Sequence, residues 1–93
     1  MEIEIMMALW FAEVRRLHNK DVAHTPMEEF FLDLTIEFDR ARNAGAPDDY
    51  LNWLLAQIDL YLSGNQDQAM ANVLTAAGKA ASKAVGNEVR WNA

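Results

Sequence analysis

Residues 25–45 read TPMEEFFLDLTIEFDRARNAG, and they begin with the strongest local signal in the chain. The hydroxyl of Thr25 can cap the free amides at the start of a helix, and Pro26 fits the first helical position because its missing N–H costs nothing there. Glu28, three residues after Thr25, can accept a hydrogen bond from the Thr25 amide and complete a capping box. The stretch therefore predicts that a helix begins at Pro26.

The apolar residues that follow repeat with the period of a helix. They step by four, three, four and three residues through Met27, Phe31, Leu34, Phe38 and Ala41. This spacing places them on one side of a helix. Gly45 can take the left-handed backbone conformation that commonly ends a helix. We predict one amphipathic helix over residues 26–43, with its apolar side in a core.

The rest of the chain shows three more helical segments. Apolar stripes and stop signals predict helices near 2–20, 48–62 and 67–85. No segment alternates apolar and polar residues over the length of a strand. Because short connections favour antiparallel neighbours, we predict an all-α fold, a compact bundle of about four helices with short connections. Residues 1–86 would form a single helical domain, and residues 87–93, which follow Gly86, a C-terminal tail.

The charges are segregated along the chain. The net charge is −6, and residues 1–20 are neutral, with three acidic and three basic residues. Residues 21–67 carry ten acidic residues against Arg40 and Arg42, a net charge of −8, and residues 68–93 carry a net charge of +2. An acidic midsection repels phosphate, so the composition disfavours nucleic-acid binding and suits a basic protein surface.

The composition and the first residues also limit which cellular location and which cysteine chemistry we expect. The chain has no cysteine, so disulfides and thiolate zinc sites are excluded. Glu2 and Glu4 stand where a signal peptide would have basic residues. The apolar run from Ile5 to Ala12 is far shorter than the ~20 residues of a membrane-spanning helix. We therefore expect a soluble, cytoplasmic protein that does not enter a membrane.

Three carboxylates of the predicted second helix, Glu29, Asp33 and Glu37, are spaced four residues apart and share one side. Carboxylates that face one another from two helices can hold Mg²⁺, which prefers oxygen ligands. A small all-α, Mg-dependent nucleotide hydrolase or nucleotide-binding protein is therefore one alternative function. The next helix offers only Asp48, Asp49 and Asp59, and the helix dipole already explains the first two, which stand in its first turn. We favour a solvated acidic row and expect no cofactor.

A second cluster contains His18, Asp21 and His24 at spacings of three. These residue types can bind zinc, and they would share one side if the first helix continued to residue 24. The helix dipole also favours histidine near a helix C-terminus, so we interpret the cluster as a helix end and a connection, with no metal. The hydroxyl residues and glycines match no nucleophile or phosphate-loop motif, so we expect no catalytic residue.

Large apolar residues exceed what a core of this size requires. The 93 residues include three Trp, four Phe, two Tyr and five Met, and such residues are enriched where proteins bind proteins. The first half of the first helix is apolar on almost every side. We predict a partner-binding site formed by Glu29, Leu32, Asp33, Ile36, Glu37 and Trp53. The alternative is that the second and third helices are buried on two sides.

These observations favour a non-enzymatic, acidic protein-interaction module over an enzyme. We expect an inhibitor or adaptor that docks onto another protein, of the kind that bacteriophages direct at host complexes; this comparison is one of size and charge. The partner would be a protein with a basic surface or, alternatively, a second copy in a homodimer. A structural subunit of a larger assembly is the remaining alternative.

Overall fold

Residues 2–92 fold into four helices joined by short connections. The structure, a computed structural model, describes the backbone of residues 2–92 and the side chains of residues 2–80 and of Ser82. Its helices are α1 (Ile3–His18), α2 (Pro26–Asn43), α3 (Asp48–Leu62) and α4 (Gln66–Asn92). No strand occurs between residues 2 and 92. The predicted all-α fold of four helices is confirmed.

The ends of α2 show the signals that the sequence predicted. The Thr25 hydroxyl accepts a hydrogen bond from the Glu28 amide at 3.1 Å, and the Glu28 carboxylate accepts one from the Thr25 amide at 2.8 Å. At the other end, Gly45 has a φ of 73° and its amide donates to the carbonyl of Arg42. That left-handed backbone would strain a residue with a Cβ atom, so glycine suits this position. Local signals in the sequence therefore set both ends of α2.

The last helix is longer than its sequence predicted. We expected it to end near Val85, with Gly86 as the stop, but α4 continues to Asn92. A glycine inside a helix costs only about 1 kcal/mol relative to alanine, and unlike proline it keeps its N–H. The preceding turns are rich in alanine, so Gly86 alone does not end the helix. The predicted tail of residues 87–93 lies within α4 except for Ala93, which is outside the described residues, and the domain boundary stays a prediction.

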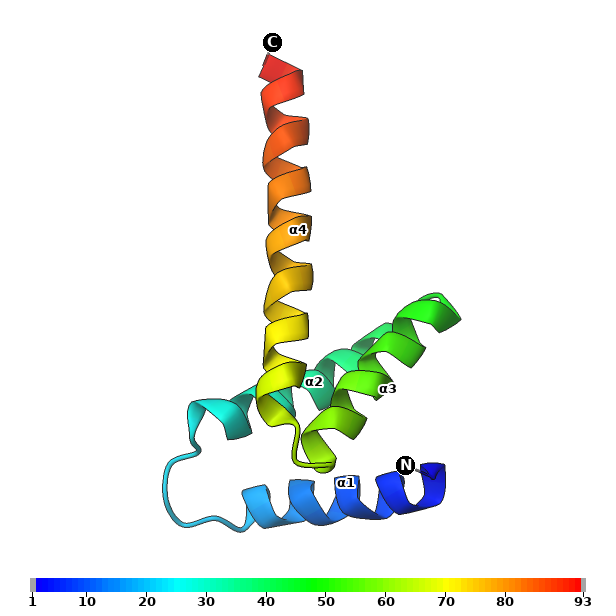
Figure 1. Cartoon of the computed structure of the whole chain (residues 1–93), viewed down its shortest axis with the longest axis vertical. Coiled ribbons are helices and arrows are strands. Elements are labelled where there is room, and N and C mark those ends of the chain that lie inside the picture. Colours follow the sequence, from blue (N-terminus) through cyan, green and yellow to red (C-terminus); the bar gives the residue numbers. More distant parts are fainter. Residues whose placement is uncertain (1, 93) are drawn as a thin grey trace.

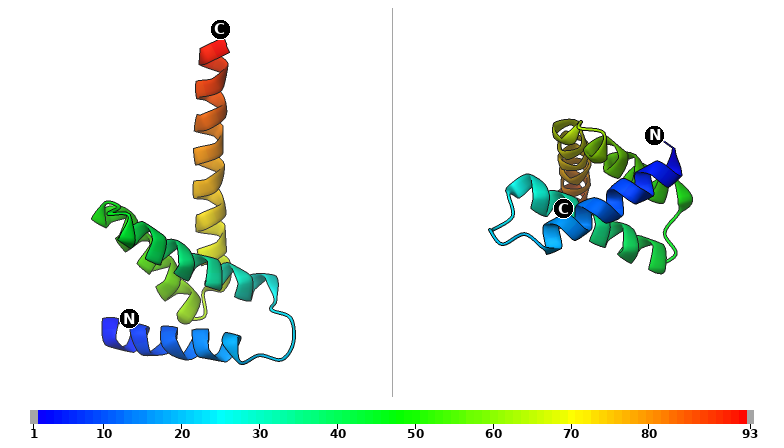
Figure 2. Two further views of the ribbon diagram at one scale, coloured as in Figure 1. Left: turned by 180° about the vertical axis from the view of Figure 1, so that it is seen from behind. Right: turned by 90° about the horizontal axis from the view of Figure 1, so that it is seen from below.

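Helix α3 is the centre of the arrangement, because it packs against each of the other three helices. Figure 1 shows α1 crossing one end of the molecule and α4 rising away from it. Ala69, near the start of α4, is buried, whereas every residue from Leu74 to Ala80 is exposed. The molecule measures 51 × 31 × 23 Å, and its long dimension follows the projecting part of α4 (Figures 1 and 2).

The core lies where α1, α2 and α3 meet. Phe31 of α2 stacks on Tyr61 of α3, with ring centroids 4.3 Å apart. Trp10 of α1 meets Phe38 of α2 edge-on, with centroids 5.6 Å apart. The remaining buried side chains of the cluster are Leu17, Leu34, Ala41, Leu54 and Ile58. All three helices therefore contribute aromatic or aliphatic groups to one continuous core.

We predict that Thr25→Ala lowers the free energy of unfolding by about 1 kcal/mol, the usual contribution of a helix N-cap. The alanine removes the hydroxyl that accepts from the Glu28 amide. Thr25→Ser keeps that hydroxyl and should behave like the wild type. Denaturant unfolding of the three proteins measures the effect, and an unchanged midpoint for the alanine variant would contradict it.

Candidate functional site

A buried carboxylate joins the first two helices. Glu28, in the first turn of α2, accepts hydrogen bonds from Lys20 Nζ, from Arg16 Nη2 at 3.0 Å and from the Thr25 amide at 2.8 Å. The bond from Lys20, followed by that from the Thr25 amide, lowers the pKa of Glu28 from 4.5 to about 2. A carboxylate that is so firmly ionised accepts protons poorly at neutral pH. Glu28 therefore acts in the fold and not as a general base.

A second carboxylate continues this network to α3. Glu13 accepts hydrogen bonds from Arg16 Nε at 2.6 Å and from the Tyr61 hydroxyl at 3.0 Å. The bond from Arg16 lowers the pKa of Glu13. Burial, followed by the bond to Glu13, raises the pKa of Tyr61. Arg16 bridges Glu13 and Glu28, so these polar contacts attach α1 to both α2 and α3.

The structure separates the three residues of the candidate zinc cluster. Because α1 ends at His18, Asp21 and His24 lie in the connection to α2. His18 and Asp21 are exposed, and Nε2 of His24 lies 2.8 Å from the carbonyl oxygen of Leu17. No group of three or more His, Asp or Glu residues within the described part of the chain is arranged to hold a metal ion. His24 ties the connection to the end of α1.

The acidic row of α2 lies on its outer side. Glu29 and Asp33 are exposed, and neither forms an ion pair with another described residue. Glu37 is half-buried and accepts hydrogen bonds from Arg40 and from the Tyr50 hydroxyl, the latter at 2.9 Å. The bond from Arg40 is the main reason why the pKa of Glu37 is lowered. The row therefore presents two free carboxylates and one that a neighbouring arginine neutralises.

Half of the predicted partner-binding residues border one pocket. It encloses about 270 Å³ between α2, α3 and α4, and its lining consists of Phe30, Asp33, Leu34, Glu37, Tyr50, Trp53, Leu54 and Val73. Tyr50 stacks on Trp53, with ring centroids 6.2 Å apart. Three aromatic rings and two carboxylates thus line a space that can take an apolar side chain.

The other predicted site residues lie outside this pocket. Ile36 is 65% exposed, and Glu29 lies on the same outer side of α2. Leu32 is half-buried and packs against the core cluster. The structure therefore leaves Ile36 as an exposed apolar residue beside the acidic row, and it gives Leu32 largely to the core.

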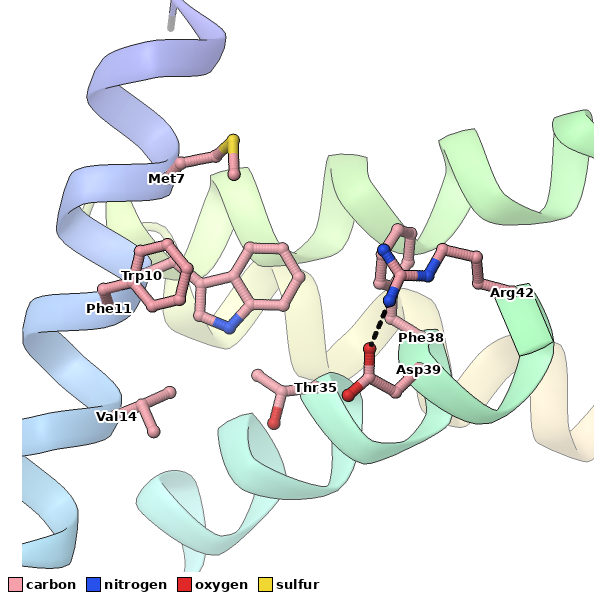
Figure 3. A pocket seen from close by; sticks show the side chains of 8 residues that line it. All are labelled: Met7, Trp10, Phe11, Val14, Thr35, Phe38, Asp39 and Arg42. Carbon is pink, nitrogen blue, oxygen red and sulfur yellow. Dashed lines mark hydrogen bonds and ion pairs between the residues drawn. The ribbon is translucent and has the colours of Figure 1, made fainter.

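A larger groove separates α1 from α2 (Figure 3). It encloses about 410 Å³ and is lined by Met7, Trp10, Phe11, Val14, Thr35, Phe38, Asp39 and Arg42. Asp39 and Arg42 form an ion pair on the α2 side, with the two atoms 3.4 Å apart. The sequence indicated the apolar character of α1 but did not predict the groove, because its width depends on how α1 crosses α2.

Neither a protein-family model, nor a curated protein, nor a solved structure matches this chain. Among the residues that the structure describes, no helix combines the length and the apolar character that crossing a membrane requires. The function is therefore inferred from the geometry and the charge of these surfaces.

We predict that Glu28→Gln weakens the fold in a pH-dependent way. Glutamine can keep the capping box, but it carries no charge for Lys20 and Arg16. Because folding lowers the pKa of Glu28 from 4.5 to about 2, its ionised form stabilises the folded protein above about pH 4.5, and this contribution is lost as the pH falls towards 2. Denaturant unfolding should show a wild-type advantage at neutral pH that shrinks below about pH 4.5.

A difference in stability that stays constant over that pH range would contradict this role of the charge. The matched control is Glu29→Gln, because Glu29 is exposed and has no ion-pair partner in the described chain. This control should follow the wild-type pH dependence.

Proposed function

We propose that this protein is a non-enzymatic, acidic interaction module that binds another protein through the outer side of α2. The observation that carries the proposal is the aromatic pocket of Tyr50 and Trp53, whose edge includes the free carboxylate of Asp33. Protein interfaces commonly combine an apolar centre that contains aromatic residues with a polar edge. The exposed Ile36 and Glu29 extend this surface along α2.

The chemistry of the surface favours one kind of partner segment. An apolar side chain would enter the pocket beside Trp53, and lysine or arginine residues next to it would meet Asp33 and Glu29. The net charge of −8 over residues 21–67 adds a longer-range attraction to a basic protein, which salt weakens. An inhibitor or adaptor, including one that a phage directs at a host complex, would act through such a contact.

Several polar groups that could serve in catalysis are already used by the fold, which favours binding over catalysis. Glu28 is ionised and paired, and the Ser63 hydroxyl donates to Asp59. Nε2 of His24 contacts a backbone carbonyl.

The alternative, a Mg-dependent nucleotide hydrolase, is tested directly by activity. Such a site requires acids on a helix that faces the α2 row, whereas Asp48 and Asp49 lie in the first turn of α3. We predict no hydrolysis of a panel of nucleoside triphosphates, with Mg²⁺ or Mn²⁺, above a protein-free control. Turnover that disappears in Asp33→Ala would overturn the proposed function.

We predict that Asp33→Lys and Ile36→Asp each weaken binding of the protein partner by about tenfold, the effect of losing one significant interface contact. Both side chains are exposed, so the free energy of unfolding should stay within about 0.5 kcal/mol of the wild-type value. The measurement is quantitative mass spectrometry of proteins retained by tagged wild type and variants, followed by titration of the purified partner.

Asp21→Lys is the matched control, because it makes the same change of charge at an exposed acid in the connection between α1 and α2. A partner retained by the wild type and by this control, and lost from Asp33→Lys, supports the α2 surface. Equal retention by all the tagged proteins would contradict it.

A further inference from the structure

The outward side of α1 carries a line of residues that no described helix covers. Seen from below, α1 lies in front of α2 and α3 (Figure 2). Four exposed residues, which we call the α1 seam, follow one another at spacings of four, three and four: Glu4, Ala8, Phe11 and Arg15. This spacing keeps them on one side of the helix, as in the contact line of a coiled coil. Phe11, near the middle of the seam, also borders the groove between α1 and α2, yet it is 67% exposed.

The bundle itself uses a different side of α1. The residues that pack inward are Met6, Trp10, Val14 and Leu17. Beside the α1 seam, Ile5 is 51% exposed and Met7 is 45% exposed. The helix thus has two apolar sides, and one chain buries only one of them. A helix that is apolar nearly all round is typical of burial by a further element.

The charges at the ends of the α1 seam complement each other. Neither Glu4 nor Arg15 has an ion-pair partner among the residues that the structure describes. They are eleven residues apart, which is about three helical turns, so they lie on the same side of α1. Ala8 and Phe11 lie between them and share their midpoint. A two-fold axis through this midpoint therefore places Glu4 of one copy opposite Arg15 of the other. The same axis places Ala8 of one copy opposite Phe11 of the other.

We infer that α1 binds α1 of a second copy in antiparallel orientation, with the α1 seams in contact. Each Phe11 ring then covers Ala8 of the other copy, where a small residue leaves room for it. Glu4 of each copy meets Arg15 of the other at the two ends of the contact. A parallel pair would oppose Glu4 with Glu4 and Arg15 with Arg15, so the charges select the antiparallel arrangement.

The distribution of net charge also favours α1 for contact between copies. Residues 1–20 are neutral, whereas residues 21–67 have a net charge of −8. A contact between two α2 surfaces would therefore bring like charges together, and a contact between two α1 helices would not. The α1 seam is separate from the α2 surface proposed for a protein partner, so the two contacts can be tested independently.

Charge exchange across the α1 seam tests this inference by sedimentation equilibrium. The wild type should show a reversible monomer–dimer equilibrium at micromolar concentration. Glu4→Arg and Arg15→Glu should each weaken dimerisation by about tenfold or more, because each creates two like-charged contacts. The double variant Glu4→Arg/Arg15→Glu restores opposite charges and should return the dissociation constant to within about threefold of the wild-type value. Circular dichroism should show all variants equally helical.

Glu29→Arg is the matched control, because like Glu4→Arg it replaces an exposed acid and changes the net charge from −6 to −4. It should leave the dimer unchanged or slightly stronger. A wild-type protein that stays monomeric, or a double variant no better than the single ones, would overturn the inference. A monomer that still binds a protein partner through Asp33 would overturn only this inference and leave the proposed function standing.

Discussion

The position of α1, and with it the groove that α1 forms with α2 and the α1 seam, depends on the buried carboxylate of Glu28. It completes the capping box of α2. It also accepts hydrogen bonds from Arg16, in the last turn of α1, and from Lys20, which follows α1 in the chain. A buried charge is costly unless hydrogen bonds satisfy it. Here none of the buried side-chain polar atoms of the described residues lacks a hydrogen-bond partner. Arg16 and Glu13 carry the same network to Tyr61 of α3. These contacts hold α1 while leaving a groove between it and α2.

This way of attaching α1 explains how a small chain presents two different surfaces. Apolar packing holds one side of α1, and the polar network holds its C-terminal end, so its other side remains outward and nearly neutral. The outer side of α2 instead carries free carboxylates beside an aromatic pocket. We propose the acidic surface as the site for a basic protein, and we infer separately that the neutral surface contacts a second copy. Their separation would let one molecule make both contacts.

The sequence predicted the features that local signals determine. The capping box at Thr25 and the left-handed Gly45 fixed α2 to the residue, but a single glycine at position 86 did not end α4. The two cationic partners of Glu28, Lys20 and Arg16, could not be predicted, because they approach it only after the connection reverses the chain. The acidic row was visible from its spacing, whereas its meeting with Trp53 depends on how α2 packs on α3. Leu32, which the sequence assigned to the partner-binding site, is half-buried and packs against the core cluster.

Hydrogen–deuterium exchange of the α1 amides, in wild type and in Glu28→Gln, tests most directly whether the buried charge holds α1. The measurement belongs at neutral pH and at a concentration low enough to exclude association. If the charge holds α1, the α1 amides lose more protection in the variant than the amides around Phe31 and Tyr61 lose, because a local opening of α1 adds to the lower global stability. Equal exchange of α1 in the two proteins, or wild-type α1 amides that exchange as fast as an unfolded peptide, would contradict this.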